Sequence, residues 1–336
     1  MFYILTVLIS FLVSFFLLPF CIKFAKKFGI LDHPTSSIKT HLFSTPYLGG
    51  FAIAVGFWIS LICIRFLTHF PTGTLRSLRG IFMGSFIIFI LGLIDDIKPL
   101  DYKIKFIVQL VCASVLFQYG IAIKIFDSQI INYFFSVLWI LAIINGINII
   151  DVMDGLSSTV IILSSFFFFL IGLPQENIYV NFASLALLGA TFAFFIFNFP
   201  PAKIFMGDAG SLTSGFILAS ISLGAQYSQK HLIGLFSPVL ILAVPFFDLV
   251  FVMFHRIRKG TSPFLGSKDH FALRLQHFGF TKKNILLRVS ITCFVLGFCA
   301  WLITIFPAKW AFVILGCIGL LGIYFATWLS LIEVRE

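Results

Sequence analysis

Eleven apolar stretches divide this chain, and they constrain its fold more than any other feature. Each is about 15 to 23 residues long, against the ~20 residues that a helix needs to cross the hydrocarbon of a bilayer. They lie at 2–22, 49–70, 80–94, 104–120, 133–150, 156–173, 179–198, 211–226, 233–254, 285–306 and 309–331. Charged residues make up only 11% of the 336 residues, against ~25% in soluble domains. We expect an all-α, polytopic integral membrane protein with about eleven transmembrane helices, ten or eleven depending on 211–226.

The chain leaves no room for a separate soluble domain. Its longest polar stretch, from His255 to Lys283, has fewer than 30 residues, so we assign residues 1–336 to a single transmembrane catalytic domain. The first apolar stretch lacks a positive leading region and a small-residue cleavage site, so we interpret it as a retained helix with the N-terminus outside. An alternating segment between two later stretches, "GIAIKIFDSQIIN", predicts a small periplasmic β-hairpin that turns near Asp127 and Ser128.

The basic residues indicate how the chain is oriented. Counting crossings from an outside N-terminus places 17 of the 23 lysines and arginines on the cytoplasmic side, as the positive-inside rule expects. Only the loop with Arg76 and Arg79 argues the other way. The net charge of +10 comes from short loops rather than one soluble face, which argues against nucleic-acid binding. We therefore expect a multi-pass protein of the cytoplasmic (inner) membrane.

Seven of the 13 acidic residues fall at the ends of apolar stretches, and the same count puts all seven on the cytoplasmic side. They are Asp95, Asp96, Asp101, Asp151, Asp154, Asp208 and Asp269. Like charges this close repel one another unless cations lie between them. The pattern predicts a layer of carboxylates that holds positive ligands at one membrane surface.

Two of these aspartates follow an asparagine at a spacing of three residues. Asn148, Asp151 and Asp154 share one face if this segment is helical. The alternative is that the aspartates only cap the next helix, at ~1 kcal/mol each. Two carboxylates and an amide on one face exceed what capping requires.

The other aspartates have structural alternatives as well. Asp95 and Asp96 are adjacent, so they cannot share a helix face, and one of them could end the helix. Asp208 stands between glycines in "FMGDAGS", which on its own is more often a tight turn. In the functional interpretation, the helix that follows Asp208 offers its N-terminus to phosphate oxygens.

Asp248 is the exception, because it lies inside the apolar stretch 233–254. An ionisable group at such a depth is a functional candidate, and His255, seven residues later, falls on the same helix face. The alternative is a pairing with a basic side chain for packing. We interpret Asp248 as a residue that holds other site residues in place without contacting the substrate itself.

The polar loop "HRIRKGTSPFLGSKDHFALRL" that follows is rich in cations. Each basic residue there could serve orientation alone, but as a set they resemble a clamp for a polyphosphate. Carboxylates without a histidine or cysteine set point to Mg²⁺ or Mn²⁺. A hard metal below a cationic loop at a membrane surface suits phosphoryl transfer to a lipid. A cation-coupled transporter is the alternative from another class, but it predicts an inverted repeat, which the sequence does not show.

These motifs together resemble the polyprenyl-phosphate N-acetylhexosamine-1-phosphate transferase family, which includes the phospho-MurNAc-pentapeptide translocase and the undecaprenyl-phosphate GlcNAc-1-phosphate transferases. The match runs in order through "TPYLGG", "GLIDD", "NGINIIDVMDGL", "FMGDAGS", "P-x-x-D", "HRIRKGTSPF" and "DHFALRL". The resemblance implies Mg²⁺-dependent cytoplasmic transfer of a sugar 1-phosphate from a UDP-sugar to a polyprenyl phosphate such as undecaprenyl phosphate, releasing UMP. Such a step initiates cell-envelope glycan synthesis, and homodimers occur in the family.

Carried over by position, the resemblance implies roles for individual residues. Asp208 and Asn148 match the metal site, and Asp95 the group that deprotonates or orients the attacking lipid phosphate. Asp96, Asp151 and Asp154 match the other acidic positions, so the candidate catalytic set is Asp95, Asp96, Asp151 and Asp154. The candidate substrate-binding residues are Lys39, His255, Arg256, Arg258, Phe264 and His270.

One departure bears on the substrate. The family commonly carries several histidines in the last loop, whereas here His270 is followed by Phe271, Ala272 and Leu273. This counts against the pentapeptide translocase, which we keep as the alternative, and against assuming an unmodified GlcNAc donor. We expect a single in-line attack on the donor β-phosphate, with an aspartyl-phosphate intermediate as the rival.

Overall fold

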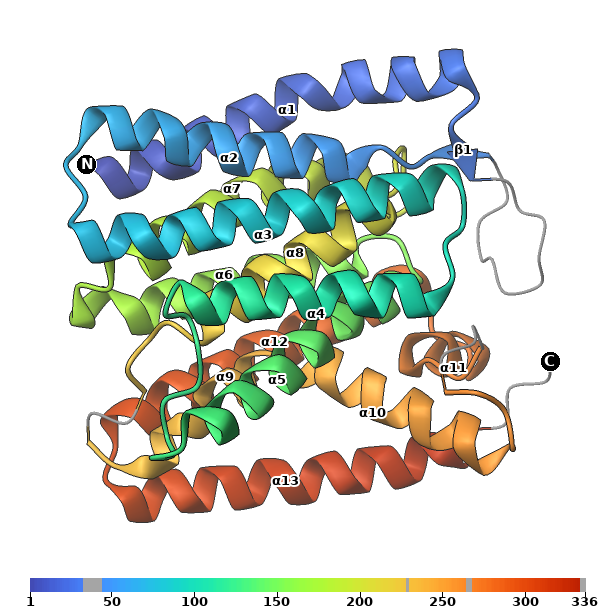
Figure 1. Cartoon of the computed structure of the whole chain (residues 1–336). Coiled ribbons are helices and arrows are strands. Elements are labelled where there is room, and N and C mark those ends of the chain that lie inside the picture. The colour runs from blue at the N-terminus through green and yellow to red at the C-terminus, as the bar shows by residue number, and fades with distance from the viewer. Residues whose placement is uncertain (33–43, 228–229, 264–267, 333–336) are drawn as a thin grey trace.

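The computed structural model describes residues 1–32, 44–227, 230–263 and 268–332, and these are almost entirely helical (Figure 1). In chain order the elements are α1 (Phe2–Phe28), β1 (Leu31–Asp32), β2 (Thr45–Pro46), α2 (Gly49–Leu67), α3 (Thr72–Ile97), α4 (Tyr102–Gln118), α5 (Gln129–Ile149), α6 (Leu156–Gly172), η1 (Leu173–Gln175), α7 (Ile178–Asn198), α8 (Gly207–Ser222), η2 (Leu232–Phe236), α9 (Ser237–Ile241), α10 (Ala243–Arg258), α11 (Phe271–His277), α12 (Lys282–Ile305) and α13 (Ala308–Ser330). The two short strands pair antiparallel. The expected all-α membrane class is confirmed.

Within the described residues, eight helices are long and apolar enough to cross a membrane. A ninth span results if the bent pair Leu232–Ile241 and Ala243–Arg258, which meet at 74°, counts as one. Two further expected crossings correspond to α4 and α8, which are shorter, at 17 and 16 residues. The structure therefore establishes a multi-pass membrane protein but not the expected count of eleven.

The bend before α10 has a local cause. Pro245 stands in the first turn of α10, where a proline is tolerated because the amide hydrogens of a first turn have no partner inside the helix. Without an N–H, Pro245 cannot continue the hydrogen-bond ladder from α9, so the helix restarts at a new angle. The expected straight helix over 233–254 is thus two helices.

The expected β-hairpin near Asp127 and Ser128 is wrong, because the described residues of that segment form no strand. Side chains of α5 take its backbone amides instead. Ser136 accepts from Ile123 N at 2.8 Å, and Asn132 accepts from Phe126 N at 3.1 Å while donating to Phe126 O at 2.7 Å. Once helix side chains satisfy these groups, a second strand is not needed.

The helix α8 forms the centre of the bundle, and every residue from Ala209 to Ser222 is buried. Glycines let neighbouring helices approach it closely, as is usual in membrane bundles. A Cβ on Gly92 of α3 would lie 2.5 Å from Ala209 Cα, and one on Gly50 of α2 would lie 2.2 Å from Gly210 N. The first turn of α8 is therefore held rigidly between α2 and α3.

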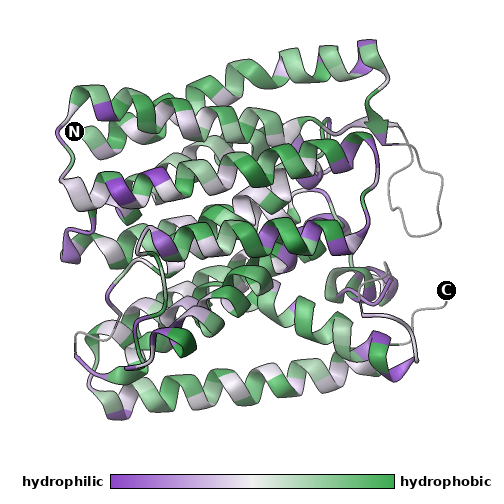
Figure 2. Ribbon diagram, in the orientation of Figure 1, coloured by the Kyte–Doolittle hydropathy of each residue, from purple (hydrophilic) through white to green (hydrophobic). Residues whose placement is uncertain are grey.

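Figure 2 shows that apolar residues cover the lengths of the helices, whereas hydrophilic residues gather near the ends of the helices and in the loops. The N-terminus lies at one end of the bundle (Figure 1). The link between α3 and α4, helix α11 and the C-terminal end of α13 lie at the other end. This second end carries the aspartates that the crossing count places on the cytoplasmic side.

Candidate functional site

The first turn of α8 carries Asp208, and its position is fixed by backbone and side-chain contacts from two helices. The "TPYLGG" segment pairs with the residues before it, since Gly49 N and Gly50 N donate to Phe205 O at 3.0 Å and Met206 O at 2.8 Å. From α3, Asp96 accepts from Asp208 N at 2.7 Å and from Ala209 N at 3.0 Å. Asp96 therefore caps α8 from outside the helix.

This contact corrects one expectation. The amide hydrogens of Asp208 and Ala209 at the N-terminus of α8 were expected to face phosphate oxygens, but the carboxylate of Asp96 already occupies them. A carboxylate satisfies the helix dipole as a phosphate would. Asp96 therefore holds Asp208 in place through the backbone of α8.

Asp95 faces a different way, as its adjacency to Asp96 required. One oxygen of Asp95 accepts from Leu100 N at 2.7 Å. The other forms an ion pair with Lys105 of α4, and the same ammonium lies 3.0 Å from Asp208 Oδ2. Lys105 thus joins carboxylates from α3 and α8.

Lys105 is the residue of this site that the sequence analysis missed. In the sequence it is only one of the 17 basic residues that the crossing count places on the cytoplasmic side. The sequence does mark Lys105 in one way, because this lysine lies inside the apolar stretch 104–120, whereas Lys103 precedes it. A lysine at that position requires a nearby anion.

Asn148 completes the group from α5. Its amide nitrogen donates to Asp208 Oδ1 at 3.0 Å and to Ser211 Oγ at 2.9 Å. One turn earlier Asn145 donates to Gln109 Oε1 of α4 at 2.8 Å, which ties the two helices together. We refer to Asp95, Asp96, Lys105, Asn148 and Asp208 as the α3–α8 cluster.

Asp151 and Asp154 do not share a helix face with Asn148, contrary to expectation. Helix α5 ends at Ile149, and residues 150–155 form a turn that closes at Gly155, where φ is 78°. Asp151 accepts from Ser157 Oγ at 2.5 Å, whereas Asp154 pairs with Lys282 Nζ at 3.2 Å. Burial raises the pKa of Asp151 to about 7, although the Ser157 hydrogen bond opposes this.

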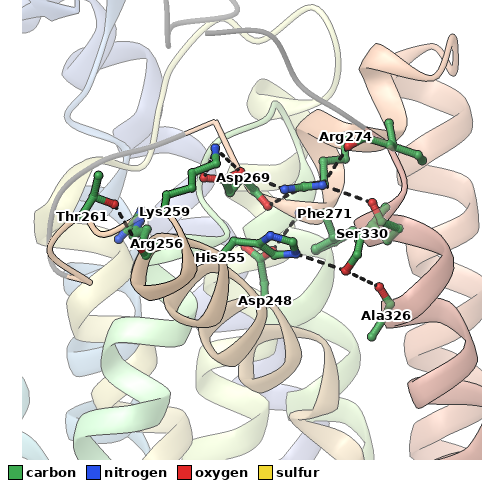
Figure 3. Close-up of polar contacts among 12 residues, drawn as sticks. Asp248, His255, Arg256, Lys259, Thr261, Asp269, Phe271, Arg274, Ala326 and Ser330 are labelled. Carbon is green, nitrogen blue, oxygen red and sulfur yellow. Dashed lines mark hydrogen bonds and ion pairs between the residues drawn. The ribbon is translucent and has the colours of Figure 1, made fainter.

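A second group of charges joins α10 to the loop that follows it and to α11 (Figure 3). Asp248 is fully buried. Its Oδ2 lies 2.9 Å from His270 Nδ1, and its Oδ1 accepts from Phe271 N at 2.8 Å. His255 lies seven residues later on the same face of α10, as expected, and its ring approaches Ser330 Oγ of α13 at 3.2 Å. The partners of Asp248 come from the returning loop rather than from its own helix.

Asp269 anchors the same loop through two cations. Lys259 Nζ lies 3.0 Å and Arg274 Nη2 2.8 Å from its Oδ1. Arg274 also donates to Leu329 O in the last turn of α13 at 3.2 Å and to Ile332 O, just after that helix, at 2.8 Å. Burial alone would raise the pKa of Asp269, but hydrogen bonds and charge from Lys259 and Arg274 hold it below its ordinary value. We refer to Asp248, Lys259, Asp269, His270 and Arg274 as the α10–α11 cluster.

The remaining expected substrate contacts divide into three kinds. Arg256 is buried and donates to Pro263 O at 2.7 Å, so it holds the loop. Arg258 is exposed. Lys39 and Phe264 lie outside the described residues.

A metal ion at this end finds oxygen donors but no cage of protein ligands. In the described parts of the chain, no three acidic, histidine or cysteine side chains converge on one point. Mg²⁺ does not require such a cage, because it commonly takes one or two carboxylates together with substrate phosphates. Asp208 fits that donor set, and Asn148, which contacts Asp208 through its amide nitrogen, carries a further side-chain oxygen.

Comparison with known proteins gives consistent matches over most of the chain. The model of the family described as glycosyl transferase family 4 matches residues 78–226. The "Probable undecaprenyl-phosphate N-acetylglucosaminyl 1-phosphate transferase" of Bacillus subtilis is 30% identical over 302 residues, covering 87% of this chain and 82% of the relative.

Two further relatives come from other bacterial groups. The decaprenyl-phosphate N-acetylglucosaminephosphotransferase of Mycobacterium tuberculosis is 28% identical over 332 residues, or 89% of this chain and 82% of the relative. The undecaprenyl-phosphate alpha-N-acetylglucosaminyl 1-phosphate transferase of Escherichia coli is 27% identical over 307 residues, or 85% of this chain and 80% of the relative. Each match extends well beyond the residues of the two clusters.

Proposed function

Because this chain belongs to glycosyl transferase family 4, we propose that it transfers N-acetylhexosamine 1-phosphate from a UDP-sugar to a polyprenyl phosphate such as undecaprenyl phosphate. The second product is UMP. The relatives are named for N-acetylglucosamine and for undecaprenyl or decaprenyl phosphate, which supports this reading over a pentapeptide translocase or an ion-coupled transporter. The reaction would initiate the assembly of a cell-envelope glycan.

The observation that carries the proposal is the α3–α8 cluster. The carboxylates of Asp95 and Asp208 share the Lys105 ammonium, and the carboxylate of Asp96 binds the backbone amide of Asp208, so the three are neighbours at one end of the bundle. Such an excess of negative charge suits a bound cation and, through it, a pyrophosphate. A scaffold protein would gain nothing from this arrangement, because uncompensated carboxylates near a membrane destabilise the fold.

In the proposed reaction an oxygen of the lipid phosphate forms a bond to the donor β-phosphorus. The bond between that phosphorus and the oxygen bridging to the α-phosphate breaks, and UMP leaves with the bridging oxygen. Asp95, which shares the Lys105 ammonium with Asp208, would orient the lipid phosphate and accept its remaining proton. Phosphoryl transfer of this kind depends mainly on positioning and charge neutralisation.

The proposal includes a divalent cation, Mg²⁺ or Mn²⁺, that Asp208 would hold, with Asn148 as the neighbouring residue of the site. When bound, such an ion would neutralise charge on the phosphates of the donor. The chain's own residues supply the rest: Asp96 keeps Asp208 in place, and Lys105 keeps the facing carboxylates of Asp95 and Asp208 together.

We also propose that the aspartate end faces the cytoplasm and the N-terminus faces outward, in the cytoplasmic membrane. The excess of basic residues in the loops of that end supports this orientation. If α4 and α8 both cross the bilayer, the chain has the eleven spans that the hydropathy pattern predicts.

The test is a transfer assay with purified protein in detergent, Mg²⁺, radiolabelled UDP-GlcNAc and undecaprenyl phosphate. We expect labelled lipid and an equal amount of UMP, both absent for Asp208→Asn and both retained by Asp101→Asn. Asp101 is the matched control because it lies at the same end but only caps α4 through Lys103 N at 2.8 Å. Wild-type activity in Asp208→Asn would overturn the site, and no transfer from any of a panel of UDP-sugars would overturn the function.

The same assay separates the two chemical routes. Exchange of labelled UMP into UDP-GlcNAc without the lipid would indicate an aspartyl-phosphate intermediate. Strict dependence of UMP release on undecaprenyl phosphate supports the single displacement that we propose.

A further inference from the structure

Asp248 is a buried carboxylate that the proposed reaction does not use directly. It lies in the otherwise apolar first half of α10 and is 0% exposed. Both of its oxygens are engaged by consecutive residues of the returning loop, His270 Nδ1 at 2.9 Å and Phe271 N at 2.8 Å (Figure 3). A buried charge is stable only where its hydrogen bonds offset the free-energy cost of removing it from water.

The contact determines which nitrogen of His270 carries a proton. An ionised carboxylate can only accept hydrogen bonds, so the Nδ1 atom that faces Asp248 must be the protonated one. The other tautomer would bring a lone pair on Nδ1 against the carboxylate in a site that excludes water. His270 is therefore left with Nε2 as its variable atom: an acceptor when the ring is neutral and a second donor when the ring is protonated.

Anchoring the loop does not account for this arrangement. The same loop is already held by Asp269, whose carboxylate binds Lys259 and Arg274, and Arg274 is itself tied to the end of α13. A cap for Phe271 N requires one acceptor atom, which an asparagine or serine at position 248 would supply. The second oxygen of Asp248 instead contacts the ring of His270.

We infer that Asp248 is a positioning residue that holds His270 in the Nδ1-protonated form and so directs Nε2 toward the phosphates of the nucleotide-sugar donor. The inference rests on the proposed function for the identity of the ligand. The tautomer of His270 is a property of the protein alone and can be measured whatever the ligand is.

The first test therefore measures the tautomer without substrate. Protein labelled with ¹⁵N-histidine would be studied by NMR in detergent micelles, with the His270 signals assigned by their loss in His270→Gln. We expect a single Nδ1–H tautomer in the wild type and a mixture or the Nε2–H form in Asp248→Asn. An Nε2–H tautomer in the wild type would overturn the inference even if the variant did not fold.

The second test measures kcat/KM for UDP-GlcNAc with undecaprenyl phosphate in excess. We expect Asp248→Asn and His270→Gln each to lose on the order of 10- to 100-fold, the usual effect of disturbing an oriented histidine. The double variant should lose no more than the worse single one, because both changes remove one unit. Asp101→Asn is the control and should keep wild-type kcat/KM.

The outcomes separate the two proposals. Additive losses in the double variant, or full activity in Asp248→Asn, would contradict the positioning role while leaving the transferase intact. If the wild type releases no UMP but shows the Nδ1–H tautomer that Asp248→Asn disrupts, the proposed function fails and the pairing stands.

Discussion

The two charged clusters lie at the same end of the bundle but differ in how their charges are compensated. In the α3–α8 cluster, Asp95, Asp96 and Asp208 are joined by the ammonium of Lys105 and by amide hydrogens. In the α10–α11 cluster, Asp248 and Asp269 face Lys259, Arg274 and the ring of His270. The α3–α8 cluster has more anions than cations, whereas the anions and cations of the α10–α11 cluster balance.

The difference indicates what each group does. A matched set of buried ions holds structural elements together, and breaking it leaves an uncompensated charge. An unmatched set is costly in the empty protein and becomes favourable when a cation arrives. We therefore assign cation binding to the α3–α8 cluster, and the fixing of the loop and the positioning of His270 to the α10–α11 cluster.

The largest expected effect is on stability, from Arg274→Met. Arg274 and Asp269 are both buried, at 4% and 3% side-chain exposure, and the variant would also leave the Leu329 and Ile332 carbonyls without this donor. Breaking such a pair costs about 3–5 kcal/mol. Unfolding titrations in mixed micelles should show this loss, and the exposed Arg258→Met should stay within ~0.5 kcal/mol of wild type. A small effect for Arg274→Met would mean that the cluster is not structural.

Lys105→Met should act mainly on activity. The methionine keeps most of the side-chain length but removes the charge between Asp95 and Asp208, and we expect UMP release to fall about 10²- to 10³-fold. Mg²⁺ should also raise the unfolding temperature of this variant more than that of the wild type, because the metal replaces a missing cation. The exposed Lys103→Met should match the wild type in both measurements. Equal Mg²⁺ effects in Lys105→Met and wild type would contradict the charge account.

Gly92→Ala tests whether the position of Asp208 depends on close packing. The added Cβ would lie 2.5 Å from Asp208 O and Ala209 Cα, both backbone atoms, so α3 and α8 must separate. Overpacking of this kind costs about 1–3 kcal/mol, so we expect a lower unfolding temperature together with a clear loss of transfer measured at a temperature where the variant stays folded. Gly73→Ala in the first turn of α3 meets no atom within 4 Å and is the control. Full activity in Gly92→Ala would show that the fit is less tight than the structure indicates.

The smallest effects concern pH and should have opposite signs in the two regions. The pKa of Asp151, which lies near Asp208, is raised to about 7 by burial. Its protonated form is favoured in the folded state, so its stabilising contribution is complete at low pH. That contribution is lost as pH rises from the unfolded value of ~3.9 toward 7. In EDTA, the unfolding temperature of Asp151→Asn relative to wild type should therefore rise between pH 5 and pH 8.

Asp269 should behave in the reverse manner. Lys259 and Arg274 more than offset the effect of burial and lower the pKa of Asp269, so its contribution is present above the unfolded pKa and disappears as pH falls through the folded value. The stability difference between wild type and Asp269→Asn should shrink on acidification. The same sign for Asp151 and Asp269 would contradict the opposite pKa shifts that burial gives Asp151 and that cation pairing gives Asp269.

The sequence predicted the membrane class and the set of aspartates at one end because hydropathy and crossing counts depend on local composition. It did not predict the partners. Asp248 binds His270, which is 22 residues away, and no helical spacing encodes that contact. Asp151 and Asp154 left the expected helix face because the chain turns between Ile149 and Leu156.

Lys105 shows a different limit. A lysine near the end of an apolar stretch has the same appearance whether it orients the chain or pairs with a carboxylate, and only the packing of α4 against α3 and α8 distinguishes the two. The start of α3 was placed too late for a related reason. Arg76 and Arg79 interrupt the apolar run, yet arginine is a good helix former and both side chains are exposed, so the helix continues to Thr72.

The most direct test of the central distinction is Mn²⁺ binding, measured by electron paramagnetic resonance titration in the presence of UDP-GlcNAc. Wild type, Asp208→Asn and Asp269→Asn would be compared in the same detergent. We expect one tight site in the wild type, retained by Asp269→Asn and weakened at least ~10-fold in Asp208→Asn. Equal binding by Asp208→Asn and wild type, or loss of the site only in Asp269→Asn, would contradict it.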